Sequence, residues 1–285
     1  MIGYFLALIP LYIVLYQPIT NLIYGTPALQ IQINPEIFLN TSFIAVEDAT
    51  SRALDCPAHT YQTHILKLEP LIIYIEDFLT VSEQEHLIKI SADKFEPSTV
   101  TTGQETSVNE EIRRSEVAFL DRDNVVRCIE NRARAFQGWR ENLHIERLRT
   151  QRYGPGGHYA HHYDWSGGSR AQDRVSTFMV YVDVSEDIQG GGTEFPRLRM
   201  KVGEESGMGR WCEFLDCEKM AEASGEGEGE GGGLVFRPVK RNAVFWVNIQ
   251  PDGRGYEETW HAGLPVEKGE KVGLNIWSWG SARGA

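Results

Sequence analysis

Hydrophobic residues dominate the first 24 positions of the chain, where charged side chains are absent. An apolar run covers residues 2–16, interrupted only by Pro10, and a second apolar patch covers residues 22–24. The first run has the length of a signal-peptide core, and the two patches together reach the roughly 20 residues that a membrane-spanning helix needs. We therefore predict a signal anchor over residues 1–24, with a cleaved signal sequence or a buried N-terminal helix as alternatives.

The pattern then changes from irregular to helical. Residues 25–60 lack strong periodicity, which indicates a stalk, and residues 71–75 form a short apolar run typical of a strand. Ser82 and Glu85 have the spacing of a capping box, in which each side chain bonds the backbone N–H of the other residue. This spacing predicts a helix that begins near Ser82.

A second helix and a series of strands follow. Asp123 or Asn124 can cap a helix that runs to about residue 137, and the polar segment 96–111 is a candidate mobile loop. Helices followed by many short strands predict an α+β fold, in which an antiparallel sandwich or barrel packs against helices. The predicted strands cover residues 145–153, 177–184, 235–238, 243–248 and 272–279.

The charges separate a neutral head from an acidic body. The 285 residues carry 28 basic and 40 acidic side chains, for a formal net charge of −12, and the first charged residue is Glu36. No Lys/Arg-rich block is present, which argues against a nucleic-acid partner. The Gly/Glu-rich tract 224–233 cannot bury apolar area, so we expect it to be solvated within a polar insertion over residues 196–234.

The four cysteines bear on the compartment. Cys212 and Cys217 are five residues apart and can close a short disulfide loop, with a zinc-binding pair as the alternative. Cys128 falls among apolar residues at helical spacing, which predicts a buried thiol, and Cys56 has no assignment. The triplet at residues 40–42 is a glycosylation acceptor, consistent with entry into the secretory pathway.

Candidate metal ligands occur in two places. His162 and Asp164 are two residues apart, so in an extended chain they project from the same face. A second imidazole would complete the two-His, one-carboxylate set of non-haem Fe(II) oxygenases, which leaves three coordination positions open. His261 is the natural candidate. His161 points to the opposite face, and we expect no metal contact from it.

Lys271 is a further candidate site residue, in addition to the metal ligands. It lies ten residues after His261, in a β-rich run. An iron-chelating 2-oxo acid with a distal carboxylate needs a cation several ångströms from the metal, and a lysine on the next strand supplies that charge. The alternative is an ordinary solvated lysine.

These residues together resemble a known family. The strings are Arg-Tyr-Gly-Pro-Gly-Gly-His-Tyr-Ala-His-His-Tyr-Asp at 152–164, Gly-Gly-Gly-Thr-Glu-Phe-Pro at 190–196, and His-Ala-Gly-Leu-Pro-Val at 261–266, followed by Lys271. In this order they resemble the prolyl 4-hydroxylase family of 2-oxoglutarate/Fe(II) dioxygenases. The resemblance runs from about Glu69 to Trp279.

The resemblance implies a fold and a set of cofactors. The fold is an α+β protein with a double-stranded β-helix (jelly-roll) core and N-terminal supporting helices, here over residues 61–285. The cofactors are Fe(II), 2-oxoglutarate, O₂ and L-ascorbate. The reaction couples hydroxylation of the substrate to decarboxylation of 2-oxoglutarate to succinate.

The resemblance also implies roles for individual residues. It assigns Fe(II) to His162, Asp164 and His261, and the distal carboxylate of 2-oxoglutarate to Lys271. Tyr153 and Thr177 match positions that line the cosubstrate pocket, and Tyr159 and Trp277 match positions that face the substrate.

The segment 113–120 departs from the family pattern. Many relatives carry Arg-Thr-Ser-Ser-Gly there, whereas this chain has Arg-Arg-Ser-Glu-Val. Arg113 is either a ligand for a peptide carbonyl or an ordinary surface arginine. Glu116 and Val117 are bulkier than Ser-Gly and add a charge, which puts the choice of substrate in doubt.

The predicted function is hydroxylation of proline in a peptide or protein substrate. The expected location is the endoplasmic reticulum membrane with the catalytic domain in the lumen, or outside the cell after signal cleavage. One alternative is the same chemistry on another side chain or a small molecule. Another is a catalytically inactive binding module tethered to the membrane. The sequence leaves the oligomeric state open.

Overall fold

The computed structural model describes residues 42–46, 54–102, 105–140, 142–166, 172–199, 208–222 and 233–281. The predicted anchor over residues 1–24 and the acceptor Asn40 lie outside these residues. Within the described part of the chain, no helix is long and apolar enough to cross a membrane. The described residues belong to the predicted catalytic domain and to short pieces of the segment before it.

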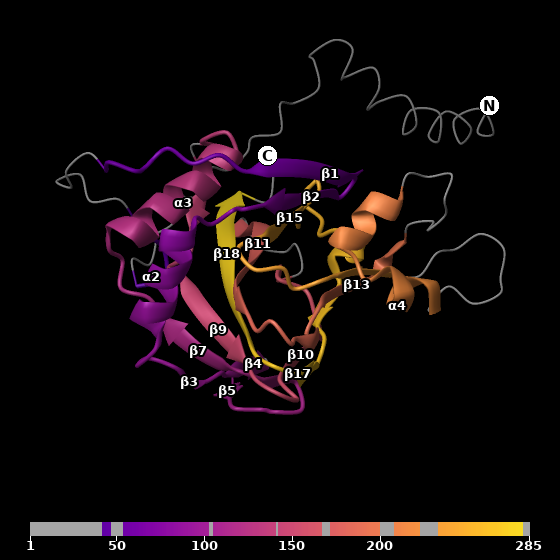
Figure 1. Cartoon of the computed structure of the whole chain (residues 1–285). Helices are drawn as coiled ribbons and strands as arrows, with labels where there is room; N and C mark the ends of the chain where they lie inside the picture. The colour runs from indigo at the N-terminus through magenta and orange to yellow at the C-terminus, as the bar shows by residue number, and fades with distance from the viewer. Residues whose placement is uncertain are drawn as a thin grey trace, which may run out of the picture. The chain divides into compact units, whose positions relative to one another are not determined.

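Two large antiparallel sheets form in the described residues (Figure 1). The larger sheet has the order β1 (Gln62–Leu68), β2 (Leu71–Glu76), β15 (Ala243–Val247), β11 (Gln172–Val184), β18 (Lys271–Ser281), β9 (Arg149–Tyr153), β7 (Glu116–Phe119) and β3 (Glu96–Pro97), with β8 (His144–Ile145) paired to β18. The smaller sheet has the order β14 (Gly233–Phe236), β13 (Thr193–Arg199), β16 (His261–Gly263), β10 (His158–His162) and β6 (Arg113–Arg114).

Shorter elements complete the described fold. β12 (Gln189–Gly190) pairs with β17 (Val266–Lys268), and β4 (Val100–Thr102) pairs with β5 (Glu105–Ser107). The helices are α2 (Val81–Ser91), α3 (Asn124–Phe136), α4 (Cys217–Glu222) and the 3-10 turns η2 (Met208–Glu213) and η3 (Glu257–Thr259). The structure is thus mostly β with few helices, and the predicted strand-rich region corresponds to β8, β9, β11, β14, β15 and β18.

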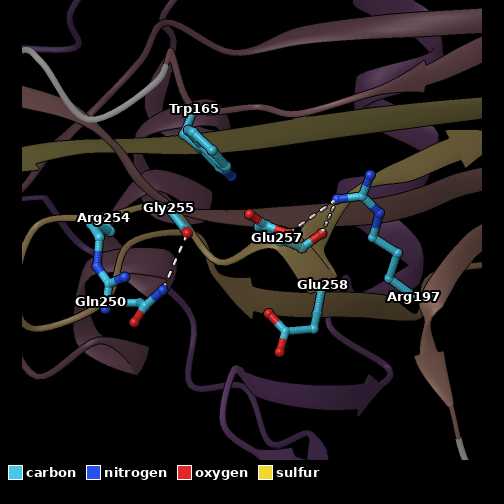
Figure 2. A pocket seen from close by; sticks show the side chains of 7 residues that line it. All are labelled: Trp165, Arg197, Gln250, Arg254, Gly255, Glu257 and Glu258. Carbon is cyan, nitrogen blue, oxygen red and sulfur yellow. Dashed lines mark hydrogen bonds and ion pairs between the residues drawn. The ribbon is translucent and has the colours of Figure 1, made fainter.

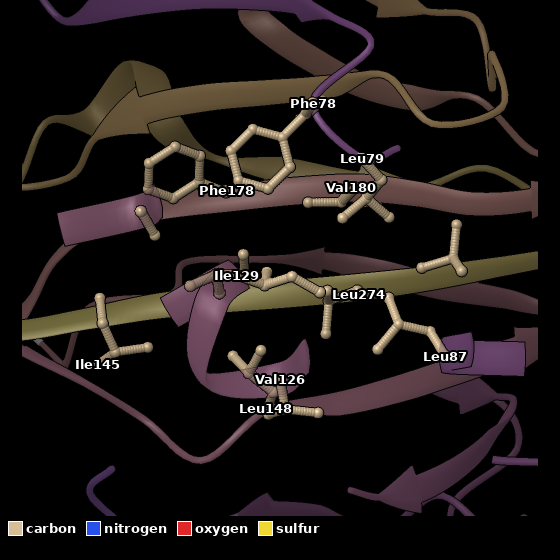
Figure 3. Close-up of a cluster of buried hydrophobic side chains, with 14 of the residues drawn as sticks. Phe78, Leu79, Leu87, Val126, Ile129, Ile145, Leu148, Phe178, Val180 and Leu274 are labelled. Carbon is tan, nitrogen blue, oxygen red and sulfur yellow. The ribbon is translucent and has the colours of Figure 1, made fainter. Parts of the chain in front are cut away.

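Helices α2 and α3 cover one face of the larger sheet (Figure 1). Side chains alternate along a strand, so Phe178 and Val180 of β11 and Leu274 of β18 share this face. They pack against Leu87 of α2 and Ile129 of α3, which are fully buried (Figure 3). The two helices thus cover the face of the larger sheet that points away from the smaller sheet.

The other face of the larger sheet packs against the smaller sheet. Met179 and Tyr181 of β11, the alternate residues, join Phe195 of β13 and Phe236 of β14 in a second buried cluster. Trp246 of β15 belongs to the same cluster and is 1% exposed. Two sheets with a hydrophobic core between them form the sandwich that the sequence predicts.

The cap of the first helix differs from the sequence prediction. The capping box consists of Thr80 and Glu83, two residues before the predicted pair Ser82 and Glu85. The Thr80 hydroxyl accepts from the Glu83 N–H at 3.1 Å, and Glu83 accepts from the Thr80 N–H at 2.9 Å. Glu83 also pairs with Arg132 of α3 at 2.6 Å. This contact between helices selects the earlier of two boxes that the sequence allows.

The predictions for the second helix and the short disulfide are confirmed, but the prediction for Cys128 is wrong. Asp123 caps α3, and Cys212 bonds Cys217. Cys128 is not a free thiol, because it bonds Cys56. Helical spacing placed Cys128 on the buried side of α3, but it carried no information on which distant segment lies beside that helix.

Two segments predicted to be polar and irregular contain structure. The region 96–111 holds β3 and the hairpin β4–β5. Within the predicted insertion, Phe214, Leu215 and Met220 are buried in the cluster between the sheets. Residues 224–232 of the Gly/Glu tract lie outside the described residues. The described part of the insertion therefore contributes to the core.

A short piece of the predicted stalk contacts the catalytic domain. Ile44 and Ala45 are buried, and Ile44 forms a β-bridge with Glu146. The Ala45 N–H donates to the Ile145 carbonyl at 2.8 Å. Chain outside the predicted domain boundary thus pairs with the segment that leads into β9.

Candidate active site

Three side chains converge where β10 and β16 lie side by side. His162 ends β10, His261 begins β16, and the two residues are register partners in the antiparallel pair. Asp164 lies two residues beyond His162. Its Oδ1 is 3.7 Å from His162 Nε2, and its Oδ2 is 3.9 Å from His261 Nε2. One ligand atom from each residue fits within 4.8 Å of the others, as a shared metal ion requires.

Backbone carbonyls fix the tautomer of both histidines. His162 Nδ1 bonds the Ala160 carbonyl at 2.9 Å, and His261 Nδ1 bonds the Thr259 carbonyl at 2.8 Å. Because a carbonyl only accepts, each Nδ1 carries the proton and each Nε2 presents a lone pair. Burial lowers the pKa of His162 to about 3, so its ring is neutral at physiological pH.

The carboxylate between the histidines remains ionised. Burial by itself would raise the pKa of Asp164, but His261, His162, Arg174 and the Thr177 hydroxyl together lower it below its usual range. Two imidazoles and one carboxylate suit Fe(II) and leave open coordination positions. The predicted triad is thus assembled, and its donor set fits the metal.

A buried chain of hydrogen bonds holds Asp164. Thr177 Oγ1 donates to Asp164 Oδ2 at 2.8 Å, and Asn248 Nδ2 donates to Thr177 Oγ1 at 2.9 Å. Trp246 Nε1 in turn donates to Asn248 Oδ1 at 2.8 Å. Thr177, which the sequence placed beside the cosubstrate, therefore contacts a metal-ligand side chain. Sequence reasoning missed Asn248 and Trp246, whose spacing of two residues in a predicted strand is the one available signal.

Lys271 is a buried cation without an anionic partner. It is 1% exposed, and its Nζ donates to the Gly191 carbonyl and lies 4.9 Å from the centre of the Tyr153 ring. Among the described residues, no carboxylate lies within ion-pair distance of it. Burial lowers the pKa of Lys271 to about 7. An unpaired buried ammonium is costly, so the site fits a ligand that brings a carboxylate.

Lys271 and the metal ligands belong to different sheets. His162 and His261 lie on the smaller sheet, whereas Lys271 begins β18 of the larger sheet and pairs in register with Tyr153 of β9. The sequence interpretation of Lys271 as a residue on the strand next to His261 is therefore wrong, because the chain crosses between sheets after β17. The metal triad and the buried ammonium of Lys271 are therefore contributed by different layers.

The residues that the sequence assigned to the substrate lie beside the triad. The ring of Tyr159 stacks on His162, with centroids 3.7 Å apart, and Arg113 lies 4.6 Å over the Tyr159 ring. Trp277 pairs in register with Thr177 and is 5% exposed. His161 instead bonds Glu194 at 2.7 Å, which confirms that it faces away from the metal site.

Three charged residues near Trp277 were not found from the sequence. Arg174 bonds Glu146 at 2.6 and 3.0 Å, and Arg149 bonds the same carboxylate at 3.2 Å. Burial alone would lower the pKa of Arg174, but Glu146 raises it above its ordinary value. The sequence signal is that Glu146 and Arg149 are charged residues inside a predicted strand, and it does not indicate which residues pair.

A cavity of about 650 Å³ lies beside the chain segments that follow Asp164 and precede His261 (Figure 2). Trp165 follows Asp164 in sequence and donates from Nε1 to the Thr259 hydroxyl at 3.1 Å. Across the cavity, Arg197 pairs with Glu257 at 3.8 Å. The full lining is Trp165, Arg197, Gln250, Arg254, Gly255, Glu257 and Glu258. The cavity is polar and mixed in charge, and it lies beside the segments that carry two of the metal ligands.

The fold and the site define an oxygenase. The family model described as the 2OG-Fe(II) oxygenase superfamily matches residues 148–279, which contain the metal triad and Lys271. The segment that the family model matches begins just before β9 and ends within β18. The class is that of 2-oxoglutarate/Fe(II)-dependent dioxygenases.

Relatives narrow the class. Prolyl 4-hydroxylase 5 of Arabidopsis thaliana is 31% identical over 226 residues, covering 75% of this chain and 69% of the relative. Prolyl 4-hydroxylase subunit alpha-3 of Homo sapiens is 28% identical, covering 75% of this chain and 34% of the relative. A structure of viral collagen prolyl hydroxylase from Paramecium Bursaria Chlorella virus-1, a 2OG complex, has a TM-score of 0.52 and 25% identity over 73% of this chain and 96% of that chain. The chain belongs to the prolyl 4-hydroxylase family.

Proposed function

We propose that the protein hydroxylates proline residues in a peptide or protein and couples this to decarboxylation of 2-oxoglutarate to succinate. Fe(II), 2-oxoglutarate and O₂ are required, and L-ascorbate supports turnover. The observation that carries the proposal is the metal triad of His162, Asp164 and His261 together with the buried, unpaired ammonium of Lys271. The names of the relatives support proline as the residue modified.

The metal-binding residues act by fixed geometry. His162 and His261 present Nε2 lone pairs, and the Thr177 hydroxyl restrains Asp164 from the side of Oδ2. Fe(II) with bound 2-oxoglutarate and O₂ supplies the oxidising power that inserts oxygen into an unactivated C–H bond. The chain contributes the position and the ionisation state of the three side chains that hold the metal.

The second task of the chain is to orient the cosubstrate and exclude water. The Lys271 ammonium pairs with the distal carboxylate of 2-oxoglutarate, and the Tyr153 ring lies beside that ammonium. Phe195 and Trp246 flank His261 with ring centroids at 5.3 and 4.9 Å. These apolar walls keep water from the buried side of the metal site.

The substrate side of the site is aromatic and cationic. Tyr159, Trp277 and Arg113 are proposed to contact the peptide around the reacting proline, since they lie beside the triad. The Arg113 Nε donates to Ser115 Oγ at 3.0 Å, which leaves its terminal nitrogens for a peptide carbonyl. This arrangement favours an extended peptide over a small metabolite.

The proposed location is the endoplasmic reticulum membrane with the catalytic domain in the lumen. The apolar residues 1–24 support a membrane anchor, and the two disulfides support an oxidising compartment. Secretion after signal cleavage is the alternative. A protease-protection assay on tagged full-length protein in microsomes tests this: digestion of the C-terminal tag without detergent contradicts a luminal domain.

The function is tested with the purified full-length protein, Fe(II), 2-oxoglutarate and ascorbate. The substrate is an extended proline-containing peptide, and the control is the same peptide with alanine at each proline. We expect peptide-dependent release of succinate and a gain of one oxygen atom on proline. Succinate release that does not depend on the peptide but increases with a small metabolite contradicts the assignment. Modification of the alanine control at the same rate as the proline peptide also contradicts it.

A further inference from the structure

Two guanidinium groups enclose an indole on the substrate side of the site. Arg174 of β11 and Arg149 of β9 lie 3.9 and 4.5 Å from the ring centre of Trp277. Trp277 is 5% exposed, and its Nε1 has no hydrogen-bond partner among the described residues. Buried donors are nearly always paired in folded proteins, so this unpaired N–H indicates that an acceptor is absent from the site.

The positive charge of this group is only partly neutralised. Arg174 binds Glu146 through two nitrogens, at 2.6 and 3.0 Å, and so occupies most of that carboxylate. Arg149 contacts the same carboxylate through Nη2 alone, at 3.2 Å. Among the described residues, Glu146 is the only hydrogen-bond acceptor of Arg149, and the Arg149 Nε has no partner. Two cations therefore share one carboxylate.

The residues around Arg149 add to the excess of positive charge. The charges of Arg174 and Arg113 both act to lower the pKa of Arg149, after the larger effect of burial. Glu146 is the carboxylate that opposes them. Arg149 thus lies beside two other arginines and shares its one carboxylate with Arg174, which is also influenced by Asp164. Such a guanidinium attracts a further anion, and guanidinium groups bind carboxylates with paired N–H donors.

Arg149 contacts an aromatic ring on each of two sides. On its outer side it lines a cavity of about 210 Å³ together with Phe43 and Phe119, and its guanidinium lies 5.6 Å from the ring of Phe119. On its inner side it contacts Trp277, whose register partner Thr177 bonds Asp164.

We propose that Arg149, with the N–H of Trp277, binds a carboxylate of the peptide substrate close to the proline that is hydroxylated. The inference rests on the proposed function and adds a substrate class to it. The carboxylate comes from an aspartate or glutamate beside the proline, or from a proline at the free C-terminus. Arg174 is already paired with Glu146 and holds the indole in place.

The test uses full-length protein and matched peptides. One set carries Glu, Gln or Lys next to a single proline, and a second set ends in proline with either a free or an amidated C-terminus. We expect kcat/KM to be about tenfold higher for Glu than for Gln, and lowest for Lys, because hydrogen bonds to charged groups are worth roughly that factor or more. A matching preference for the free C-terminus identifies the terminal carboxylate as the source.

Substitutions assign the preference to one residue. Arg149→Gln should bring the Glu-to-Gln ratio close to one, whereas Arg149→Lys should keep part of it. Arg152→Gln is the matched control, because Arg152 lies on the same strand and instead pairs with Glu116 at 2.7 Å. A wild-type protein that treats Glu, Gln and Lys peptides alike refutes the inference, and so does an Arg149→Gln variant that retains the full preference.

Equilibrium binding separates this inference from the proposed function. The dissociation constants of the same peptides are measured by calorimetry with Mn²⁺ and 2-oxoglutarate in place of the active mixture. Tighter binding of Glu peptides that depends on Arg149, without oxygen gain on proline in the activity assay, supports the carboxylate site and refutes proline hydroxylation. Proline hydroxylation without any charge preference in binding or turnover supports the proposed function and refutes the carboxylate site.

Discussion

The Thr177 hydroxyl donates a hydrogen bond to Asp164 Oδ2 at 2.8 Å, and Thr177 lies on the larger sheet while Asp164 follows a strand of the smaller one. The contact thus joins the two layers at the metal site. Because Asn248 supports the same hydroxyl at 2.9 Å, the orientation of the carboxylate depends on a chain of buried residues.

Thr177→Val should weaken metal binding. The change keeps the shape of the side chain but removes the donor to Asp164, and loss of such supporting contacts lowers metal affinity about 10- to 100-fold. Titration with Fe(II) under anaerobic conditions measures the effect, and Thr177→Ser should restore most of the affinity. Equal affinity in wild type and Thr177→Val would show that Asp164 needs no support from this hydroxyl.

His162→Ala should abolish succinate release, because it removes one of three ligands. His161→Ala is the matched control, since His161 is the adjacent histidine and bonds Glu194 instead. We expect near-wild-type turnover from the control. Succinate release at the wild-type rate from His162→Ala would mean that the metal is bound elsewhere.

Lys271→Ala should raise the KM for 2-oxoglutarate about 10- to 100-fold, the value of a hydrogen bond to a charged group. The effect on kcat at saturating 2-oxoglutarate should be smaller, because the metal ligands are unchanged. Steady-state kinetics with varied 2-oxoglutarate separates the two parameters. A variant with an unchanged KM would contradict the assignment of Lys271 to the distal carboxylate.

Binding of 2-oxoglutarate should weaken as pH rises. Burial lowers the pKa of Lys271 to about 7, so the free protein loses this charge above about that pH. Affinity should then fall by up to about tenfold per pH unit, and Lys271→Ala should lack this slope. Calorimetry on either side of pH 7 measures it.

The same shift affects the stability of the free protein, with the opposite sign. An exposed lysine has a pKa of 10.5, so between about 7 and 10.5 the unfolded chain binds a proton that the folded chain has released. The contribution of Lys271 therefore favours folding increasingly as pH rises through that interval. Comparing the pH dependence of unfolding in wild type and Lys271→Ala isolates this contribution; parallel curves would contradict it.

The two disulfides should differ in their effect on stability. Cys56 and Cys128 are 72 residues apart, whereas Cys212 and Cys217 are 5 apart. Loop-closure entropy predicts a loss of about 4 kcal/mol for removal of the first and about 2 kcal/mol for the second. Urea unfolding of the two double Cys→Ser variants tests the order, and a larger loss for the short loop would contradict it.

The metal site could be predicted from the sequence because its signals are local. His162 and Asp164 are separated by two residues, and an extended chain brings them to one face whatever the rest of the fold does. His261 and Lys271 were candidates from the chemistry that the site needs, and the resemblance to a family implied the same two residues. The structure places the three ligand atoms together, and in the part of the chain that it describes no carboxylate pairs with Lys271.

The remaining features depend on strand register and on contacts between distant segments. Thr177 bonds Asp164 because of the pairing of β11 with β18 and the position of the segment that carries Asp164. Neither can be predicted from a local sequence pattern. The bond between Cys56 and Cys128 likewise depends on which segment lies beside α3. In α2, two overlapping capping boxes were possible, and the contact of Glu83 with Arg132 decided between them.

On the proposed function, the position of Lys271 gives 2-oxoglutarate a structural role as well as a chemical one. His162 and His261 belong to the smaller sheet and Lys271 to the larger one, so a molecule bound to the metal at one end and to Lys271 at the other would tie the two layers together. A ligand that binds only the folded state raises its stability. Saturating 2-oxoglutarate would then slow the unfolding of the metal-loaded protein as well as supply its reaction.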